Sequence, residues 1–300
     1  MKKISIWIST MRLRTLPLSI SGIILASCFA AYNGCFDWLI CVLAILTTLS
    51  FQILSNLAND YGDGIKGTDN NDRIGPERAI QTGKISPEDM FNAIKINVLI
   101  SIGLAFYLIF TAFGVKHFFL TFTFFLLGIA SVAAAIKYTV GNNAYGYKGL
   151  GDIYVFVFFG LVSVIGCYVL YAKTIDHVVF LPAITIGLLS AAVLNLNNMR
   201  DIESDKKSNK ITLAVRMGIE NSKKYHVIII SLAIVLSGLF GILYFTSLYN
   251  LIFVIAYIPL IIHIKKVLKN TEPKLLDPEL KKVALTTVAL AVLMGVGHLL

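Results

Sequence analysis

Two clusters of amide and carboxylate side chains share one spacing: Asn59 and Asp63 form the first, and Asn197, Asp201 and Asp205 form the second. Residues four apart lie on one face of an α-helix, so each cluster would present its oxygens together. Both clusters end a long apolar stretch, where a carboxylate in the bilayer costs roughly 2.5–3.5 kcal/mol. The simpler alternative, that the acids only cap helices in water, is weaker for two clusters in matching positions than for one.

Basic residues flank both clusters. They are Lys66, Arg73 and Arg78 after the first, and Lys206, Lys207, Lys210 and Arg216 after the second. Carboxylate and amide oxygens without neighbouring His or Cys suit a hard cation such as Mg²⁺, whose shell substrate phosphates often complete. Arg and Lys would neutralise such phosphates. The two clusters therefore predict a pocket for the diphosphate of a lipid-borne substrate.

Such a pocket has a definite chemistry. The metal and the cations would stabilise a departing pyrophosphate. An allylic carbocation would remain, and aromatic faces could stabilise it. A third polar segment, KYTVGNNAYGYKGLGD at 137–152, offers Lys137, Tyr138 and Lys148, with glycines that bend the backbone. We expect this segment to close over the site; the alternative is an interfacial tyrosine belt with glycine turns.

The elements that carry these residues are membrane helices. The chain has 300 residues, of which 57% are hydrophobic and 14% charged, against about 25% charged in ordinary soluble domains. The predicted helices, each long enough to cross about 30 Å of hydrocarbon, are 15–33, 37–59, 90–114, 117–137, 150–171, 176–198, 224–246, 248–268 and 282–300.

The distribution of charge predicts the orientation. Of the 26 Lys and Arg residues, only Lys116 and Lys173 fall on one side of this arrangement. By the positive-inside rule, the other side, with the N-terminus and both clusters, is cytoplasmic. The net charge of +9 is thus mostly a topology signal and gives no support to nucleic-acid binding. The four cysteines and five histidines have no metal-ligand spacing.

Four strings of residues carry a family resemblance: SNLANDYGDGIKGTD, DRIGPERAIQTGKIS, YTVGNNAYGYKGLGDI and NNMRDIESDKKSNKITLAVRMG. In these strings the chain resembles the UbiA superfamily of intramembrane aromatic prenyltransferases, and within it the 1,4-dihydroxy-2-naphthoate polyprenyltransferases of menaquinone biosynthesis. The resemblance runs in register from residue 11 to the end of the last predicted helix. It implies an all-α bundle of nine transmembrane helices, one domain over 1–300, with two related halves around a central cavity.

The resemblance also implies roles for individual residues. It implies metal ligands Asp63, Asp69, Asp201 and Asp205, catalytic residues Asp63, Asp201, Asp205 and Tyr138, and substrate-binding residues Asn59, Asn197, Arg78, Lys137 and Lys148; the flanking Lys66 and Arg73 are further candidates for substrate binding. Gly67 stands where the superfamily often has the third acid of the first motif, so Asp69 would substitute for it. Asp60 and Asp72 are candidates for a water-mediated outer shell or for handling the acceptor proton.

The implied reaction transfers a polyprenyl chain from its diphosphate to 1,4-dihydroxy-2-naphthoate, releasing CO₂ and pyrophosphate and giving demethylmenaquinol. It implies a Mg²⁺ cofactor and a place in the bacterial cytoplasmic (inner) membrane, in contact with lipid. Another aromatic acceptor, such as 4-hydroxybenzoate, is an alternative. So is a membrane transporter, although its site would lie nearer the midplane. DYGDG at 60–64 resembles the start of the CDP-alcohol phosphotransferase signature, but the rest of that signature is missing.

Overall fold

The computed structural model describes residues 2–69 and 74–300, and regular structure in this part of the chain is helical throughout. The long helical runs are α2 (Leu16–Tyr32), α3 (Trp38–Ile65), α4 (Pro87–Phe113), α5 (Phe118–Lys137), α6 to α7 (Gly151–Ala172), η4 and α8 (His177–Arg200), α10 (Leu213–Leu243), η5 and α11 (Leu248–Lys269), and η6 and α12 (Pro273–Leu299). Eight of these described runs are long and apolar enough to cross a membrane, and α2 is a shorter apolar helix of 17 residues. The predicted all-α bundle of membrane helices is confirmed.

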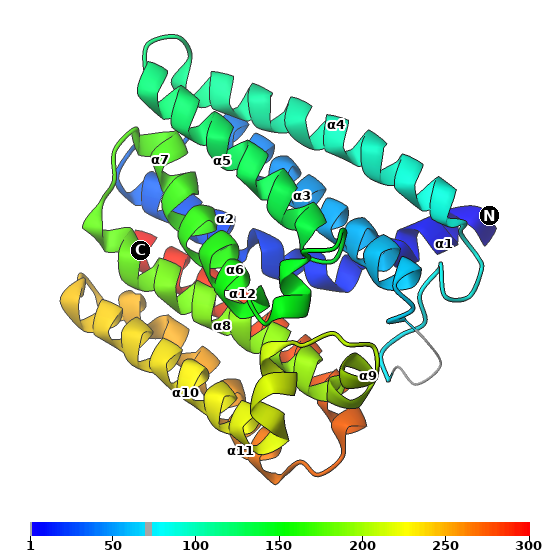
Figure 1. Cartoon of the computed structure of the whole chain (residues 1–300). Helices are drawn as coiled ribbons and strands as arrows, with labels where there is room; N and C mark the ends of the chain where they lie inside the picture. Colours follow the sequence, from blue (N-terminus) through cyan, green and yellow to red (C-terminus); the bar gives the residue numbers. More distant parts are fainter. Residues whose placement is uncertain (1, 70–73) are drawn as a thin grey trace.

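The helices form two groups. Figure 1 shows α3, α4 and α5 together on one side, and α8, α10, α11 and α12 on the other, with α2 and α6 to α7 between them. Among the long runs, α8 is the most buried and α5 the least. The core lies around α8, which packs against α10, the π-helical segment η3 (Phe156–Gly166) and α12, while α2 packs against α12.

Local sequence explains where several helices begin. The Asp37 carboxylate accepts from the backbone N–H of Leu39 at 2.8 Å and so caps α3. Ser86 caps α4 in the same way through Asp89 N–H at 3.1 Å, and Pro87 at the first helical position needs no N–H partner there. These caps place the polar loops at the helix ends.

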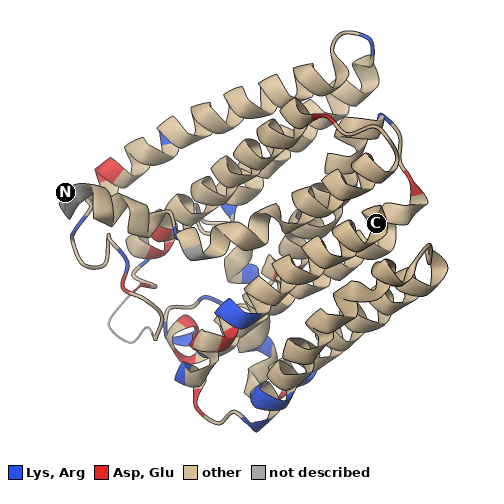
Figure 2. Ribbon diagram, turned by 180° about the vertical axis from the view of Figure 1, so that it is seen from behind, with Lys and Arg blue, Asp and Glu red and all other residues tan. Residues whose placement is uncertain are grey.

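Charged side chains gather at one end of the bundle. In Figure 2 most of the Lys, Arg, Asp and Glu residues lie at the end that carries the N-terminus. Short elements crowd the same end: α1 (Lys2–Thr10), η1 (Leu13–Thr15), η2 (Tyr145–Lys148) and α9 (Ile202–Lys207). The apolar helices therefore lead into one polar layer.

Two helix boundaries differ from the sequence expectation. Where one helix is expected at 224–246, α10 runs over Leu213–Leu243 and is divided by a kink at Gly218, whose backbone (φ 74°) is not helical; Thr212 caps the short helical turn before this kink. The second cluster does not lie on one continuous helix. Asp201, with φ −100° and ψ 10°, separates α8 from α9.

Candidate active site

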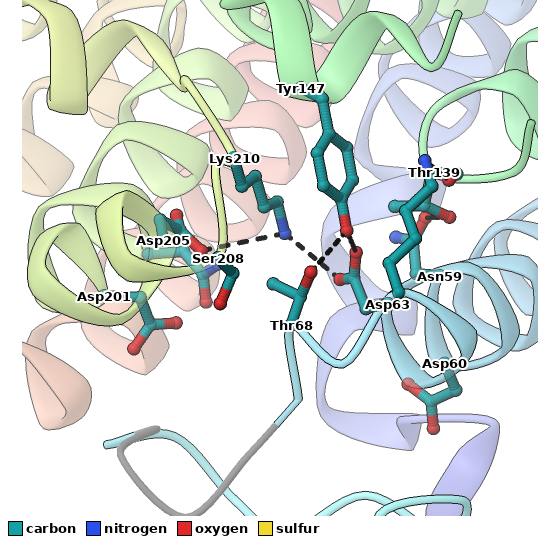
Figure 3. A network of polar contacts seen from close by, with 12 residues as sticks. Asn59, Asp60, Asp63, Thr68, Thr139, Tyr147, Asp201, Asp205, Ser208 and Lys210 are labelled. Atoms are coloured by element: carbon teal, nitrogen blue, oxygen red, sulfur yellow. Dashed lines mark hydrogen bonds and ion pairs between the residues drawn. The ribbon is translucent and has the colours of Figure 1, made fainter. Parts of the chain in front are cut away.

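The first and second clusters meet across one lysine. Asp63, in the last turn of α3, receives a hydrogen bond from Lys210 Nζ at 3.1 Å. The same ammonium lies 3.9 Å from Asp205 Oδ1, on α9 (Figure 3). The Lys210 and Asp63 side chains are each 12% exposed and that of Asp205 is 7% exposed. Carboxylates 142 positions apart in the sequence thus face one cation.

The third segment completes this cluster. Tyr147 donates from Oη to Asp63 Oδ1 at 2.7 Å, and Thr68 Oγ1 lies 2.6 Å from the same hydroxyl (Figure 3). Burial and the nearby Asp63 carboxylate raise the pKa of Tyr147, so this phenol stays protonated and keeps donating. Burial alone would lower the pKa of Lys210, but Asp63 and Asp205 outweigh it and raise that pKa above its ordinary value. Lys210 is therefore a permanent cation.

Asp201 has a different partner. Arg200 donates to both of its carboxylate oxygens, at 2.9 and 2.6 Å, and also to Asn197 Oδ1 at 2.9 Å. A further bond of 2.5 Å ties this guanidinium to Asp277, at the start of α12. The Arg200 side chain is fully buried. Its hydrogen bonds hold the chain at the break between α8 and α9. The sequence analysis did not identify Arg200 as a site residue. An arginine at the end of an apolar helix, next to the predicted acid Asp201, was the available signal.

Asp60, about one turn before Asp63 on α3, forms a separate ion-pair group. Arg12, just before η1, bonds to Asp60 Oδ1, and Arg78 Nε lies 3.5 Å from the same oxygen. The Asp60 side chain is 1% exposed. The structure thus places Arg78 beside Asp60, and it adds Arg12, which the sequence analysis missed because 48 residues separate the two partners.

Contacts from the third segment hold the end of α3. Lys66 donates to the carbonyl oxygens of Thr139 at 2.7 Å and Gly141 at 2.9 Å, and Thr139 Oγ1 donates to Asn59 Oδ1 at 3.3 Å. Burial lowers the pKa of Lys66. A Cβ on Gly62 would lie 2.8 Å from the Thr139 carbonyl carbon, so only glycine lets the two backbones approach this closely.

The remaining predicted residues fall in three places. Asp69 is buried, and its N–H donates to the Asp63 carbonyl at 3.4 Å. Lys137 and Lys148 are exposed, and Lys148 donates to Asn143 Oδ1 at 2.9 Å instead of reaching the carboxylates. Arg73 and Asp72 lie outside the described residues.

An apolar cavity adjoins the cluster. Its volume is 310 Å³, and its walls come from α2, α3, α4, α5 and η3. Gln52 and Ser55 of α3 line it, about two to three turns before Asp63. Tyr138, Tyr145 and Tyr154 line it as well, with Tyr145 stacked on Tyr154 at 3.8 Å between ring centroids. Burial raises the pKa of Tyr138 and of Tyr145, so both side chains stay neutral. The cavity suits a hydrocarbon chain beside an aromatic group.

The site has the negative charge and the oxygen donors that a hard cation requires. Within the described residues, no three His, Cys, Asp or Glu side chains are grouped closely enough to hold a metal. Asp63 and Asp205 nevertheless converge on a single positive charge, that of Lys210. Oxygen ligands of this kind leave room for substrate phosphates and waters around a hard cation.

Known proteins resemble this chain over most of its length. The model of the UbiA prenyltransferase family matches residues 20–295. A protein of Escherichia coli (strain K12) described as 1,4-dihydroxy-2-naphthoate octaprenyltransferase is 42% identical over 92% of this chain and 89% of its own length. A protein of Haemophilus influenzae with the same description is 41% identical over 100% of this chain and 97% of its own.

Solved structures share the fold. The apo structure of a UbiA homologue from Aeropyrum pernix K1 superimposes with a TM-score of 0.65, covering 96% of both chains at 13% identity. A UbiA homologue from Archaeoglobus fulgidus bound to DMAPP and Mg²⁺ gives a TM-score of 0.59 over 95% of this chain and 99% of its own, at 16% identity. On the family match and the curated relatives, this chain belongs to the UbiA prenyltransferase family.

Proposed function

We propose that this protein transfers a polyprenyl chain from its diphosphate to 1,4-dihydroxy-2-naphthoate, with loss of CO₂ and pyrophosphate, in menaquinone biosynthesis. The observation that carries the proposal is the convergence of Asp63 and Asp205 beside an apolar cavity. The identity of the acceptor is supported by two relatives, at 42% and 41% identity, that are described as octaprenyltransferases for this compound.

The metal is proposed to be Mg²⁺, held by Asp63 and Asp205 with Asp69 and Asp201 nearby. When bound, Mg²⁺ supplies Lewis-acid stabilisation of the pyrophosphate oxygens as the bond to the prenyl carbon breaks. Support for a divalent cation comes from the homologue bound to DMAPP and Mg²⁺. The amide oxygens of Asn59 and Asn197 belong to the same proposed site.

The chain's own residues then have three tasks. The permanent positive charge of Lys210 offsets the charge of the leaving pyrophosphate, and Arg78 and Lys66 are proposed to assist it. The neutral faces of Tyr138 and Tyr145 line the place where an allylic cation would form, and stabilise it without reacting. The apolar cavity excludes water, which would otherwise capture that cation.

The acceptor needs no enzyme nucleophile. The electron-rich ring forms the new C–C bond with the allylic carbon, and the ring carbon loses its carboxylate as CO₂. The electron pair of the broken C–C bond restores the aromatic ring. We propose that the site faces the cytoplasm, since most Lys and Arg residues lie at its end of the bundle (Figure 2).

A direct test offers two acceptors to the purified protein. In detergent with Mg²⁺ and a polyprenyl diphosphate, we expect a prenylated product from 1,4-dihydroxy-2-naphthoate and none from 4-hydroxybenzoate. Mass spectrometry detects either product, and EDTA together with Asp63→Asn serves as control. A prenylated hydroxybenzoate without a naphthoate product would overturn the proposed acceptor.

A further inference from the structure

A second pocket lies in the other half of the chain, between the end of α11 and the start of α12. Its volume is 600 Å³. Four lysines line it, Lys265, Lys266, Lys269 and Lys282, together with one acid, Glu279. Figure 1 shows these helix ends at the same end of the bundle as α9. None of these residues belongs to the proposed active site.

Glu279 organises the pocket without cancelling its charge. It is 5% exposed and accepts from Lys282 at 2.5 Å and Lys266 at 3.4 Å. Two buried histidines form a chain that starts at Glu279. His263 Nδ1 lies 2.8 Å from Glu279 Oε2, and His263 Nε2 lies 2.8 Å from His226 Nε2. Two ammonium groups are therefore fixed at the pocket wall by a buried carboxylate.

The other two lysines are available to a ligand. Lys265 and Lys269 are exposed, and within the described residues neither has a side-chain hydrogen bond or ion pair. They stand in the last turns of a membrane-spanning run, Leu248–Lys269. Four lysines against one glutamate leave the pocket strongly positive at the level where the helix meets water.

An apolar surface continues from this pocket toward the membrane. Ile262 and Leu275 form part of its wall, and both are more than half exposed, at 52% and 58%. One turn earlier on the same face of α11, Ile258 is 61% exposed. Residues four apart share a face of the helix, so Ile258, Ile262 and Lys266 run in one line from lipid to pocket. A ligand with a charged head and hydrocarbon tails matches this line.

We propose that this pocket binds the phosphate headgroup of an anionic phospholipid, with its acyl chains along the exposed isoleucine face of α11. Basic pockets between membrane helices have the charge and depth for such headgroups. A soluble phosphate would use the lysines but gain nothing from the apolar face. Lysines that served only to set the membrane topology would not need to line one pocket. A buried glutamate would not be needed to position them either.

The test compares two double variants of the full-length protein. Lys265→Gln with Lys269→Gln removes the two unpaired pocket charges. Lys274→Gln with Lys281→Gln removes two exposed charges from the same region that do not line the pocket. Each protein, in neutral detergent, is titrated with phosphatidylglycerol, phosphatidylcholine or inorganic phosphate. Native mass spectrometry measures bound lipid, and the thermal midpoint gives an independent readout of binding and folding.

The wild type should bind phosphatidylglycerol in preference to phosphatidylcholine, and inorganic phosphate should not raise its midpoint to the same extent. At about 1 kcal/mol per lysine near an anionic surface, the pocket variant should bind phosphatidylglycerol roughly 30-fold more weakly, while the control variant matches the wild type. Equal losses in both variants would show diffuse surface attraction and overturn the proposal. Inorganic phosphate that protects as well as phosphatidylglycerol would also overturn it, in favour of a soluble anion.

Discussion

The Lys210 ammonium lies between Asp63 and Asp205, where the proposed metal ion would bind. Replacing Lys210 by methionine tests whether the ammonium and the metal share this position. The ammonium is 3.1 Å from Asp63 Oδ2 and 3.9 Å from Asp205 Oδ1, so in the absence of metal it is the cation that both carboxylates share. Methionine keeps much of the side-chain length and removes the charge. Two carboxylates would then face each other without a compensating charge from this position.

The size of the effect follows from burial. The side chains of Lys210 and Asp63 are each 12% exposed, so water screens the pair poorly. Breaking a buried ion pair by removing one partner costs about 3–5 kcal/mol. We take about 3 kcal/mol for Lys210→Met without metal, because some solvent reaches the site. A bound divalent cation would neutralise the same two carboxylates, so the variant should regain this loss when metal is added. That corresponds to roughly 100-fold tighter metal binding than in the wild type.

The assay measures the free energy of unfolding in detergent, in EDTA and along a Mg²⁺ titration. Lys206→Met is the matched control, because Lys206 is exposed on α9, just before the loop that carries Lys210. We expect Lys210→Met to be destabilised in EDTA and rescued by Mg²⁺, and the control to respond as the wild type does. If Mg²⁺ stabilises the wild type and Lys210→Met equally, the ammonium and the metal do not compete for one place, and the reasoning is wrong.

Three further predictions concern the same layer of the protein. Arg200→Met should lower the free energy of unfolding by about 3–5 kcal/mol, because it strands buried Asp201; Arg200→Lys should recover only part of this in chemical denaturation, since it lacks the two-pronged geometry. Gly62→Ala should cost about 1–3 kcal/mol, whereas Gly103→Ala, with open space around its Cβ, should cost nothing measurable in thermal unfolding. The raised pKa of Lys210 means that its stabilisation is complete below pH 10.5 and is lost as the pH rises through the higher folded-state value. The difference in unfolding free energy between the wild type and Lys210→Met should therefore stay constant from about pH 7 to 9.

The membrane helices were predictable because their length and apolar character follow from the thickness of the bilayer. The short helical turn at the start of α10 was not, since it lies among polar residues and is separated from the apolar helix by the kink at Gly218. A polar stretch in the sequence does not by itself show whether the helix continues through it. Here the helix carries its polar residues at the water-exposed end of the bundle.

The acids of the site were predictable from their spacing, but their partners were not. The i to i+4 rule assumes an unbroken helix, and the break at Asp201 gives that carboxylate to Arg200, leaving Asp205 to face Lys210. Which lysine reaches Asp63 depends on how α9 and its following loop approach α3, and spacing along the chain does not encode that approach. The roles that the family resemblance assigns to these residues stay predictions, and so does the assignment of residues 1–300 to a single domain.

The most direct test of the central claim counts two products from one reaction mixture. With Mg²⁺, a polyprenyl diphosphate and carboxyl-labelled 1,4-dihydroxy-2-naphthoate, the wild-type protein should release one labelled CO₂ for each pyrophosphate. Asp63→Asn should lose both in parallel, by about 100-fold or more. Pyrophosphate released without labelled CO₂ would contradict the account, because the carboxylate cluster would then act on a diphosphate whose prenyl group goes elsewhere.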